Sequence, residues 1–380
     1  MSRDEMPPEG VNHLEDLCRR CAQDASDVTI NNVREFIPGL DKRVPLLDGR
    51  EVRYINLDNS ATTPPFQPVV DCLTRFFEWY SSVHRGTGFK SILSTHTYER
   101  CREVVADFVG ADLSHHTIIF GQNATHALNK LAMRICPGAD GVVVTTMMEH
   151  HSNLLPWRKL GCDVRYVRVN PEDGSLDLAD MERKIRSAGD RECLVTCSAG
   201  SNVTGELPPV RRIARMAHKH GAMMALDATQ LVPHRWLDMG APDDPERFDF
   251  AAFSAHKMYA PFGSGVLVGP RSVFAEGAPD MVGGGTIEAV TLEETIWAAP
   301  PERDEAGTPN VLGAIAVASA ARTMMSIGMD ELAAHERALT RRALTRLRRI
   351  PGLRLYGRTD PDMPVDRLGV ITMTAEGYEH

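Results

Sequence analysis

Two apolar runs in the sequence end in side chains that could do chemistry together. One run ends at Asp227, and a second ends just before Lys257, about 30 residues on, which is the length of one βαβ unit. A lysine amine can form an imine, and a carboxylate can keep a pyridine nitrogen protonated so that the ring accepts electrons. The pair matches what pyridoxal phosphate requires of a protein. A salt bridge at a sheet edge is the alternative explanation.

A small polar loop precedes an amphipathic helical pattern at Thr125. The N-terminus of a helix binds phosphate through its amide groups and its dipole. The hydroxyl of Thr125 and the neighbouring amides, including that of Ala124, are therefore predicted to hold a phosphate. A plain helix cap is the alternative at this position.

Two further polar segments follow candidate strands. In the first, the imidazole of His150 could stack on a flat aromatic ring and carry protons. A metal site is the rival interpretation, but His150 and His151 are adjacent and lack the i,i+4 spacing that aims two rings at one ion, so no metal is predicted. The second segment offers the amide of Asn202 near the same crevice.

The elements that must position these residues form an alternating pattern. Short runs rich in Val, Ile and Ala alternate with amphipathic stretches, which indicates βα units and a mostly parallel sheet. Ligands of such sheets lie at the carboxyl ends of the strands. The candidate strands are Thr117–Phe120, Gly141–Thr146, Asp163–Val169, Glu192–Cys197, Ala222–Asp227, Phe248–Phe253 and Gly265–Gly269. The candidate helices are Pro68–Ser82, His96–Val109, Thr125–Cys136, Leu178–Ser187 and Val210–His220.

Three parts are expected along the chain. Residues 1–50 form an N-terminal arm with one helix over Leu14–Ala25, residues 51–300 a large domain, and residues 301–380 a small α/β domain. The small domain should contain two long helices and two strands, at Asn310–Ile327, Met329–Ile350, Leu353–Tyr356 and Leu368–Thr374.

The composition is that of an ordinary folded protein, with 43% hydrophobic and 24% charged residues in 380. A net charge of -9 argues against nucleic acid or an anionic membrane as partner.

The sequence has neither a signal peptide nor an apolar run long enough to cross a bilayer, so a cytoplasmic location and free thiols at all eight cysteines are expected. The CxxC spacing of Cys18 and Cys21 is interpreted as accidental, because a zinc site needs two more ligands.

Several motifs, in this order, resemble the class V aminotransferase family, and within it the group-II cysteine desulfurases and selenocysteine lyases. The resemblance implies a pyridoxal-phosphate enzyme of fold type I, with a large, mostly parallel sheet domain flanked by helices and a smaller C-terminal domain. The motifs begin at Asn56-Leu57-Asp58-Asn59-Ser60 and include Val83-His84-Arg85-Gly86, Glu149-His150-His151-Ser152-Asn153, Ser201-Asn202-Val203-Thr204-Gly205, Ser254-Ala255-His256-Lys257 and Gly307-Thr308-Pro309-Asn310.

The resemblance also implies roles for single residues. Lys257 would carry the cofactor as a Schiff base, and His150 would stack on its ring and assist as an acid or base. The other cofactor residues would be Asp227 at the pyridine nitrogen, Gln230 at the ring hydroxyl, Ala124, Thr125, Ser254 and His256 at the phosphate, and Thr308 at the phosphate of a neighbouring subunit. The substrate residues would be Asn59, His84, Arg85 and Asn202.

The expected reaction is cleavage of the C–S bond of cysteine or a related amino acid. The expected partners are the amino-acid substrate, a second copy in a homodimer with active sites at the subunit interface, and a sulfur-acceptor protein. Transamination, another C–S lyase reaction or epimerisation on the same cofactor is the first alternative. A non-catalytic scaffold is the second, and the presence of both Lys257 and Asp227 argues against it.

The sequence departs from the family pattern in two places. Where the family usually has Thr-Thr-Glu, this chain has Ala124-Thr125-His126, which removes one hydroxyl and one carboxylate from the phosphate loop. Family members also continue past the position of His380 into a segment with a substrate-binding arginine and a persulfide-forming cysteine. The small domain is therefore expected to be incomplete and the sequence to be a truncated version of a longer protein.

Overall fold

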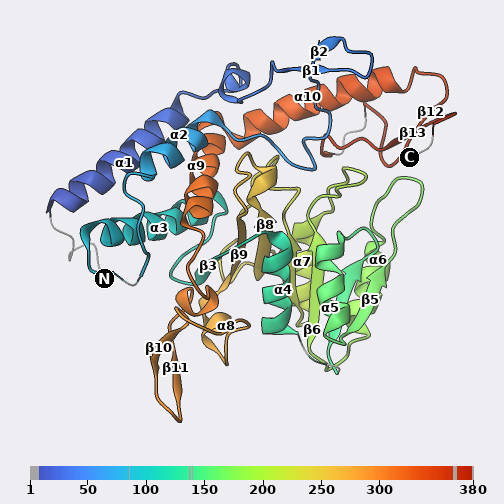
Figure 1. The fold of residues 1–380 in the computed structure, drawn as a ribbon. Coiled ribbons are helices and arrows are strands. Elements are labelled where there is room, and N and C mark those ends of the chain that lie inside the picture. The colour runs from blue at the N-terminus through green and yellow to red at the C-terminus, as the bar shows by residue number, and fades with distance from the viewer. Residues whose placement is uncertain (1–7, 85, 137, 139, 363–365, 379–380) are drawn as a thin grey trace. The chain divides into compact units, whose positions relative to one another are not determined.

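The computed structural model describes residues 8–84, 86–136, 138, 140–362 and 366–378. The chain, traced in Figure 1, forms two compact units, and each unit is built from three stretches of sequence. The N-terminal unit contains Met1–Phe108, Ser254–Ser264 and Gly307–Gly328, and the sheet unit contains Val109–Phe253, Gly265–Ala306 and Met329–His380.

A seven-stranded sheet forms the centre of the sheet unit, in the order β3-β9-β8-β7-β6-β4-β5. The pairs β8/β7, β7/β6, β6/β4 and β4/β5 are parallel, and β3 pairs antiparallel with β9. The prediction of a mostly parallel sheet is confirmed, and all seven predicted strands form close to their predicted bounds. They are β3 (His116–Gly121), β4 (Val142–Thr146), β5 (Asp163–Val167), β6 (Cys193–Ser198), β7 (Met223–Asp227), β8 (Phe250–Ser254) and β9 (Gly265–Pro270).

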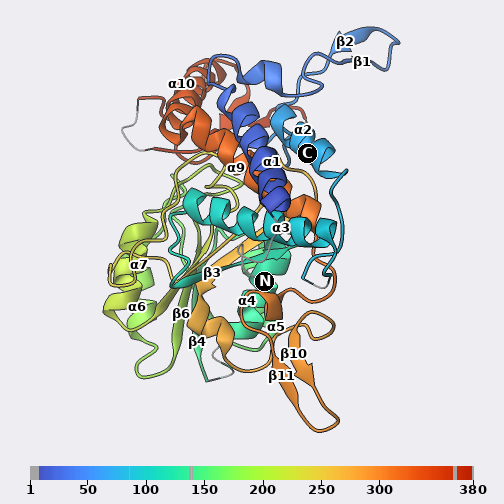
Figure 2. The ribbon, with the colours of Figure 1, turned by 90° about the vertical axis from the view of Figure 1, so that its left-hand side faces the viewer.

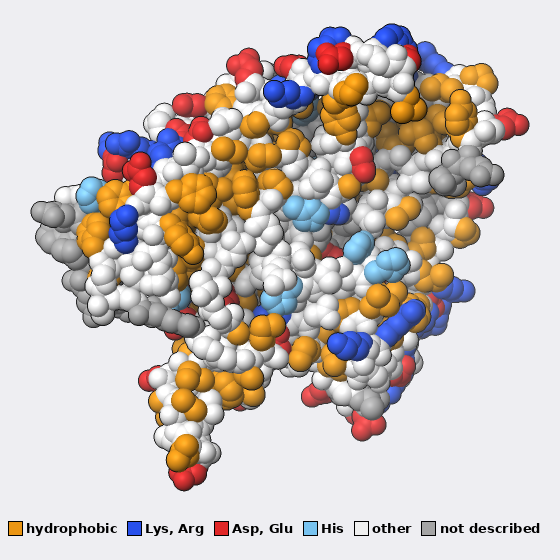
Figure 3. Space-filling model, in the orientation of Figure 1, with side chains coloured by type: hydrophobic (Ala, Val, Ile, Leu, Met, Phe, Trp, Pro, Cys, Tyr) orange, Lys and Arg blue, Asp and Glu red, His pale blue; other side chains and the backbone are white. Residues whose placement is uncertain are grey.

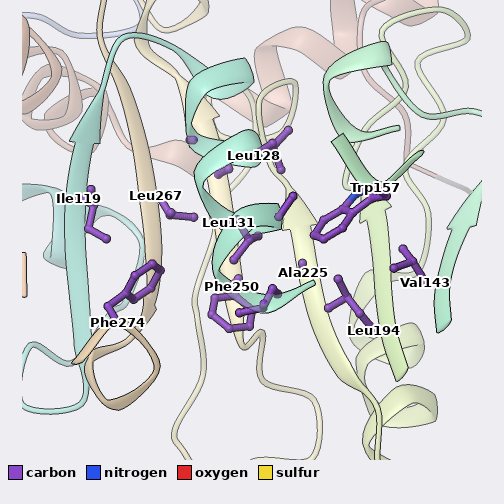
Figure 4. Packing of buried hydrophobic residues seen from close by; sticks show 14 of the residues in the cluster. Ile119, Leu128, Leu131, Val143, Trp157, Leu194, Ala225, Phe250, Leu267 and Phe274 are labelled. Carbon is purple, nitrogen blue, oxygen red and sulfur yellow. The ribbon is translucent and has the colours of Figure 1, made fainter. Parts of the chain in front are cut away.

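Helices cover both faces of this sheet. Figure 2 shows α4 (Ala124–Ile135) and α5 (Leu155–Lys159) on one side, and α6 (Leu178–Arg186) and α7 (Val210–Lys219) on the other. The apolar residues of α4 recur at helical spacing, so they share one face of the helix, and this face packs against the strands. The core on that side, shown in Figure 4, includes Leu128, Leu131, Trp157, Phe250 and Leu267. Burying a side chain of this size contributes roughly 1.5–3 kcal/mol.

The rest of the sheet unit consists of one long helix, α10, and several short elements. They are α8 (Arg271–Ala275), η3 (His151–Asn153), η5 (Glu302–Asp304), the antiparallel hairpin β10 (Ile287–Val290) and β11 (Thr295–Trp297), α10 (Met329–Leu347), and the antiparallel pair β12 (Leu353–Leu355) and β13 (Met373–Ala375). The predicted strand over Leu368–Thr374 is wrong for most of its length. The Leu368 amide donates to the Gly205 carbonyl at 2.8 Å, so the segment begins against the loop after β6, and only Met373 and Thr374 at its end pair with β12.

The N-terminal unit is built around α9 (Val311–Ile327), which packs against α1 (Pro8–Ser26), α2 (Gln67–Phe76) and α3 (Phe89–Phe108). It also contains η2 (Val33–Phe36), η4 (Ala255–Lys257) and a hairpin of β1 (Arg43–Pro45) and β2 (Glu51–Arg53). The first helix of the arm is confirmed. Among the described residues no single helix is long and apolar enough to cross a membrane, and the bent pair of α9 and α10 meets that test only on length and composition.

Four of the eight cysteines form disulfides, so the prediction of free thiols is wrong for them. Cys21 pairs with Cys72 in the N-terminal unit, and Cys136 pairs with Cys162 in the sheet unit. The partners are 51 and 26 residues apart in the sequence, and only the folding of the chain brings them together. The cytoplasmic location, inferred from the same reasoning, stays a prediction.

Candidate cofactor site

A buried carboxylate lies at the carboxyl end of the central strand β7. Asp227 is only 5% exposed and lies in register with Ser198 of β6 and Ala252 of β8. Its Oδ1 accepts a hydrogen bond from the Thr229 amide at 3.1 Å. Gln230 is buried nearby in the sequence, and the Thr229 hydroxyl is buried with no hydrogen bond to the described residues. Polar groups are thus held at a strand end where a bound molecule would satisfy them.

The predicted phosphate site is the first turn of α4. Asn123 caps this helix, and its side-chain oxygen accepts a hydrogen bond from the His126 amide at 2.9 Å. Ala124 is buried, and the Thr125 hydroxyl belongs to the first turn. At Gly265, which begins the neighbouring strand β9, an added Cβ would lie 2.3 Å from the Asn123 carbonyl carbon. Glycine at this position therefore allows the loop that starts α4 to pack directly on the sheet.

The hydroxyl of Ser152 links the predicted phosphate site to His150. It lies 2.6 Å from the Thr125 hydroxyl and 2.9 Å from His150 Nδ1. His150 Nδ1 also accepts a hydrogen bond from the Ser152 amide at 3.2 Å. Because Nδ1 acts as an acceptor, the neutral ring carries its proton on Nε2. The sequence predicted both outer residues of this chain of contacts but gave no role to Ser152.

The carboxyl group of Glu149 fastens the loop of His150 to the strands. It accepts hydrogen bonds from the Thr146 hydroxyl at 2.5 Å, the side-chain amide of Asn153 at 2.7 Å and the Ser198 hydroxyl at 2.7 Å. Burial raises the pKa of Glu149 to about 7, although these donors lower it. The run of polar residues from Glu149 to Asn153, separated by two residues from the end of the buried strand β4, was the signal in the sequence for this network.

Lys257 lies in the N-terminal unit, in the turn η4 that follows β8. The preceding carbonyl, that of His256, accepts hydrogen bonds from the hydroxyls of Thr62 and Thr63, both at 3.1 Å. Tyr259 has a φ of 64° and donates its amide to the Thr63 hydroxyl at 2.7 Å. These contacts fix the turn on both sides of Lys257.

The other two residues predicted in this turn are also ordered. Ser254 is buried at the end of β8. Burial, and secondarily the charge of Lys257, lower the pKa of His256, so its ring favours the neutral form.

The predicted substrate residues lie in loops. His84 has a φ of 64°, and its Nε2 lies 3.3 Å from Glu99 Oε1 on α3. Asn59 is exposed, and its side-chain oxygen accepts a hydrogen bond from the side-chain amide of Asn56 at 2.8 Å. Arg85 lies outside the described residues.

Two further predicted residues lie next to well-anchored positions. Thr308 is exposed in the N-terminal unit, just before Asn310, whose side chain caps α9 by accepting from the Gly313 amide at 2.9 Å. Asn202 is half-buried in the sheet unit, next to Ser201, whose hydroxyl accepts from the Thr204 amide at 3.1 Å.

The sheet unit therefore brings Thr125, His150 and Asp227 to one edge of the sheet, linked through Ser152 and through the bond from Ser198 to Glu149. Lys257, Ser254, His256, Thr308, His84 and Asn59 belong to the N-terminal unit. The functional roles of all these residues stay predictions.

The chain is similar in sequence to one family of known proteins. The family model for class-V aminotransferases matches residues 55–380. A probable cysteine desulfurase of Streptomyces coelicolor is 37% identical over 86% of this chain and 78% of its own length. A cysteine desulfurase of Haloferax volcanii is 34% identical over 90% and 82%.

Solved structures give the same grouping. The apo cysteine desulfurase of Thermococcus onnurineus has a TM-score of 0.78 and 32% identity, over 92% of this chain and 83% of its own. The cysteine desulfurase CsdA of Escherichia coli has a TM-score of 0.72 and 26% identity, over 85% and 79%.

Proposed function

Because the chain belongs to the class V aminotransferase family, we propose that it is a pyridoxal-phosphate-dependent cysteine desulfurase. The observation that carries this proposal is the buried carboxylate of Asp227 at the same sheet edge as the hydrogen-bonded set of Thr125, Ser152 and His150. The relatives named cysteine desulfurases, at 34% and 37% identity, support the choice of reaction.

The residues of the sheet unit fit the cofactor. A buried carboxylate is stable beside a protonated ring nitrogen, and Asp227 provides it. The first turn of α4 provides amides and the Thr125 hydroxyl for a phosphate. The Thr229 hydroxyl, buried without a hydrogen bond among the described residues, is a further polar atom that a ligand would satisfy.

The protein's own groups have separate tasks in this proposal. Pyridoxal phosphate, when bound, withdraws electrons from the bonds of the amino-acid substrate. Lys257 would hold the cofactor covalently, and its amine would also move protons as a general base and acid. Asp227 keeps a proton on the ring nitrogen. His150 presents its Nε2 proton, because Ser152 occupies Nδ1.

The proposed assembly is a homodimer that passes sulfur to an acceptor protein. The hairpin β10–β11 supports a protein partner, because it projects from the sheet unit with exposed apolar side chains and an acidic tip (Figure 3). Val290 is 61% exposed and Ile296 51% exposed, which is costly for apolar residues that stay in water. In the homodimer, Thr308 would contribute to the phosphate site of the neighbouring subunit.

Product analysis tests the reaction. Purified protein, pyridoxal phosphate and cysteine should yield alanine and, with a thiol reductant, sulfide in equal amounts. Formation of a keto acid with transfer of the amino group to the cofactor would replace desulfuration by transamination. Pyruvate and ammonia together with sulfide would indicate a different C–S lyase reaction.

A further inference from the structure

Four cysteines that are far apart in the sequence line one small cavity of the N-terminal unit. Cys18 and Cys21 lie on α1, Cys72 on α2 and Cys101 on α3. Among the described residues no three Cys, His, Asp or Glu side chains are arranged to hold a metal ion. We therefore interpret the clustering of these four cysteines through the redox chemistry of their sulfur atoms.

Two of the four sulfurs are already joined. The Cα atoms of Cys21 and Cys72 are 5.5 Å apart, within the usual range for a disulfide. This bond connects α1 to α2, and both residues are buried, with 4% and 5% of their surface exposed. Disulfide geometry is thus built into the packing of the two helices and does not require the backbone to move.

The other two cysteines keep their thiols but differ in reactivity. Burial raises the pKa of Cys101 to about 12, so its thiol stays protonated and is a poor nucleophile. Cys18 is only half-buried, and it lies on α1 three residues before Cys21. Residues three apart on a helix share one face and are neighbours.

The size of the cavity restricts what can reach the disulfide. Its volume is about 30 Å³, which is room for roughly two water molecules. Cys21 and Cys72 are both buried, which restricts the direct approach of a low-molecular-weight thiol to their sulfur atoms. Cys18 is partly exposed at the same cavity, and its position one helical turn before Cys21 puts it on the same face of α1.

We propose that Cys18, Cys21 and Cys72 form a thiol–disulfide exchange site for small external thiols, in which Cys18 is the outer thiol and Cys21–Cys72 the buried disulfide. The Cys18 thiolate attacks Cys21 Sγ, the Cys18–Cys21 bond forms, and the Cys21–Cys72 bond breaks. Cys72 leaves as a thiolate and takes up the proton that Cys18 released. An external dithiol then reduces Cys18–Cys21, which leaves Cys18, Cys21 and Cys72 as thiols and the reagent as a disulfide.

The site would make the attachment of α1 depend on the thiol redox state. In the oxidised protein α1 is covalently joined to α2. In the reduced protein only non-covalent contacts hold it, such as the ion pair between Asp24 and Arg75 and the apolar packing of Leu17. This property is independent of the reaction at the cofactor site.

The test follows the opening of the disulfide in the folded full-length chain. Dithiothreitol is added without denaturant, thiols are alkylated at successive times, and the modification of Cys72 is measured by peptide mass spectrometry. Wild type should start with Cys21 joined to Cys72 and then open. Cys18→Ser and Cys18→Ala should both open at least about tenfold more slowly, because the internal nucleophile is gone. Cys101→Ser, the matched control at the same cavity, should open at the wild-type rate.

A second variant isolates the exchange intermediate. In Cys72→Ser, mild oxidation should join Cys18 to Cys21.

The proposal is overturned if Cys21 and Cys72 of the wild type are both alkylated without reductant. It is also overturned if Cys18→Ser opens as fast as wild type, or if Cys101→Ser slows opening as much as Cys18→Ser does.

Discussion

At the scale of single residues, Glu149 shows how the site depends on a group that is not itself predicted to touch the cofactor. Its carboxyl group accepts three hydrogen bonds from residues of β4, of β6 and of the turn after His150. Burial opposes its ionisation and sets its pKa at about 7. Near neutral pH a small change in proton concentration therefore changes the charge inside this network.

Stability should depend on the ionisation of Glu149. Its pKa is raised from 4.5 in the unfolded chain to about 7 in the folded protein, so the folded state binds the proton more tightly. The free energy of unfolding should fall as pH rises between these values, by up to about 3 kcal/mol. Glu149→Gln should lack this part of the pH dependence. Urea unfolding of both proteins at about pH 5 and about pH 8 measures the difference.

The control for that experiment is Glu294→Gln, which changes a carboxyl group in the exposed tip of the β10–β11 hairpin. It should follow the wild-type pH dependence. A Glu149→Gln protein with the same pH dependence as wild type would show that Glu149 is not the titrating group.

Ser152 should affect cofactor affinity through its two side-chain contacts. Ser152→Ala removes the hydroxyl that lies beside both Thr125 and His150. Loss of such contacts should weaken pyridoxal phosphate binding about fivefold to tenfold, as measured by titrating apo-protein and following absorbance. Ser187→Ala, at the end of α6, should bind as wild type does. Unchanged affinity in Ser152→Ala would remove this residue from the site.

At the scale of elements, the loop after β6 depends on a glycine. Gly205 has a φ of +71°, and an added Cβ would lie 2.7 Å from the Val370 carbonyl oxygen. Gly205→Ala should therefore cost both backbone strain and a steric clash, at least about 2 kcal/mol in total.

Gly161→Ala is the matched control for this position. Gly161 has a φ of +77°, but nothing lies within 4 Å of its added Cβ. It should cost only the backbone strain, about 1 kcal/mol. Equal losses of unfolding free energy in the two variants, measured by urea denaturation, would contradict the predicted contact between the 366–370 segment and this loop.

The elements that could be predicted from the sequence are those with local signals. The strands ending at Asp227 and Ser254 are short apolar runs followed by polar residues, and both form. The first turns of α3 were missed because they bury serines: Ser94 accepts from the Ser81 amide at 3.0 Å and donates to the Trp79 carbonyl at 3.1 Å. Because these buried positions hold polar residues, the sequence of the first turns of α3 does not show the alternation of apolar and polar residues that predicts a helix.

The features that could not be predicted depend on contacts between distant parts of the sequence. The Leu368 amide pairs with the Gly205 carbonyl, and Cys21 pairs with Cys72, but neither residue of either pair carries a local signal of its partner. The same holds for the site. His150 and Thr125 stood out as single residues, whereas the hydroxyl of Ser152 that joins them required the fold.

At the scale of the whole molecule, the proposed homodimer can be tested through the projecting hairpin. The protein should sediment at about twice its chain mass of 41.9 kDa. Leu292→Asp, at the fully exposed tip of the hairpin, should weaken self-association at least about tenfold if the hairpin lies in the interface.

Leu339→Asp changes another exposed leucine, on α10, and it should leave the association constant as in wild type. A wild-type protein that sediments as a monomer at all concentrations would contradict the proposed assembly. Equal weakening by both variants would show that the effect is not specific to the hairpin.

The central claim is that this chain holds pyridoxal phosphate covalently on Lys257, and chemical trapping tests it most directly. The purified protein is incubated with pyridoxal phosphate, reduced with borohydride, digested and mapped by mass spectrometry. We expect the added mass on Lys257. Lys257→Ala should lose both the label and the visible absorbance band, and Lys219→Ala should keep both. A label on another lysine of the wild type, or no label after added cofactor, would show that Lys257 does not hold the cofactor.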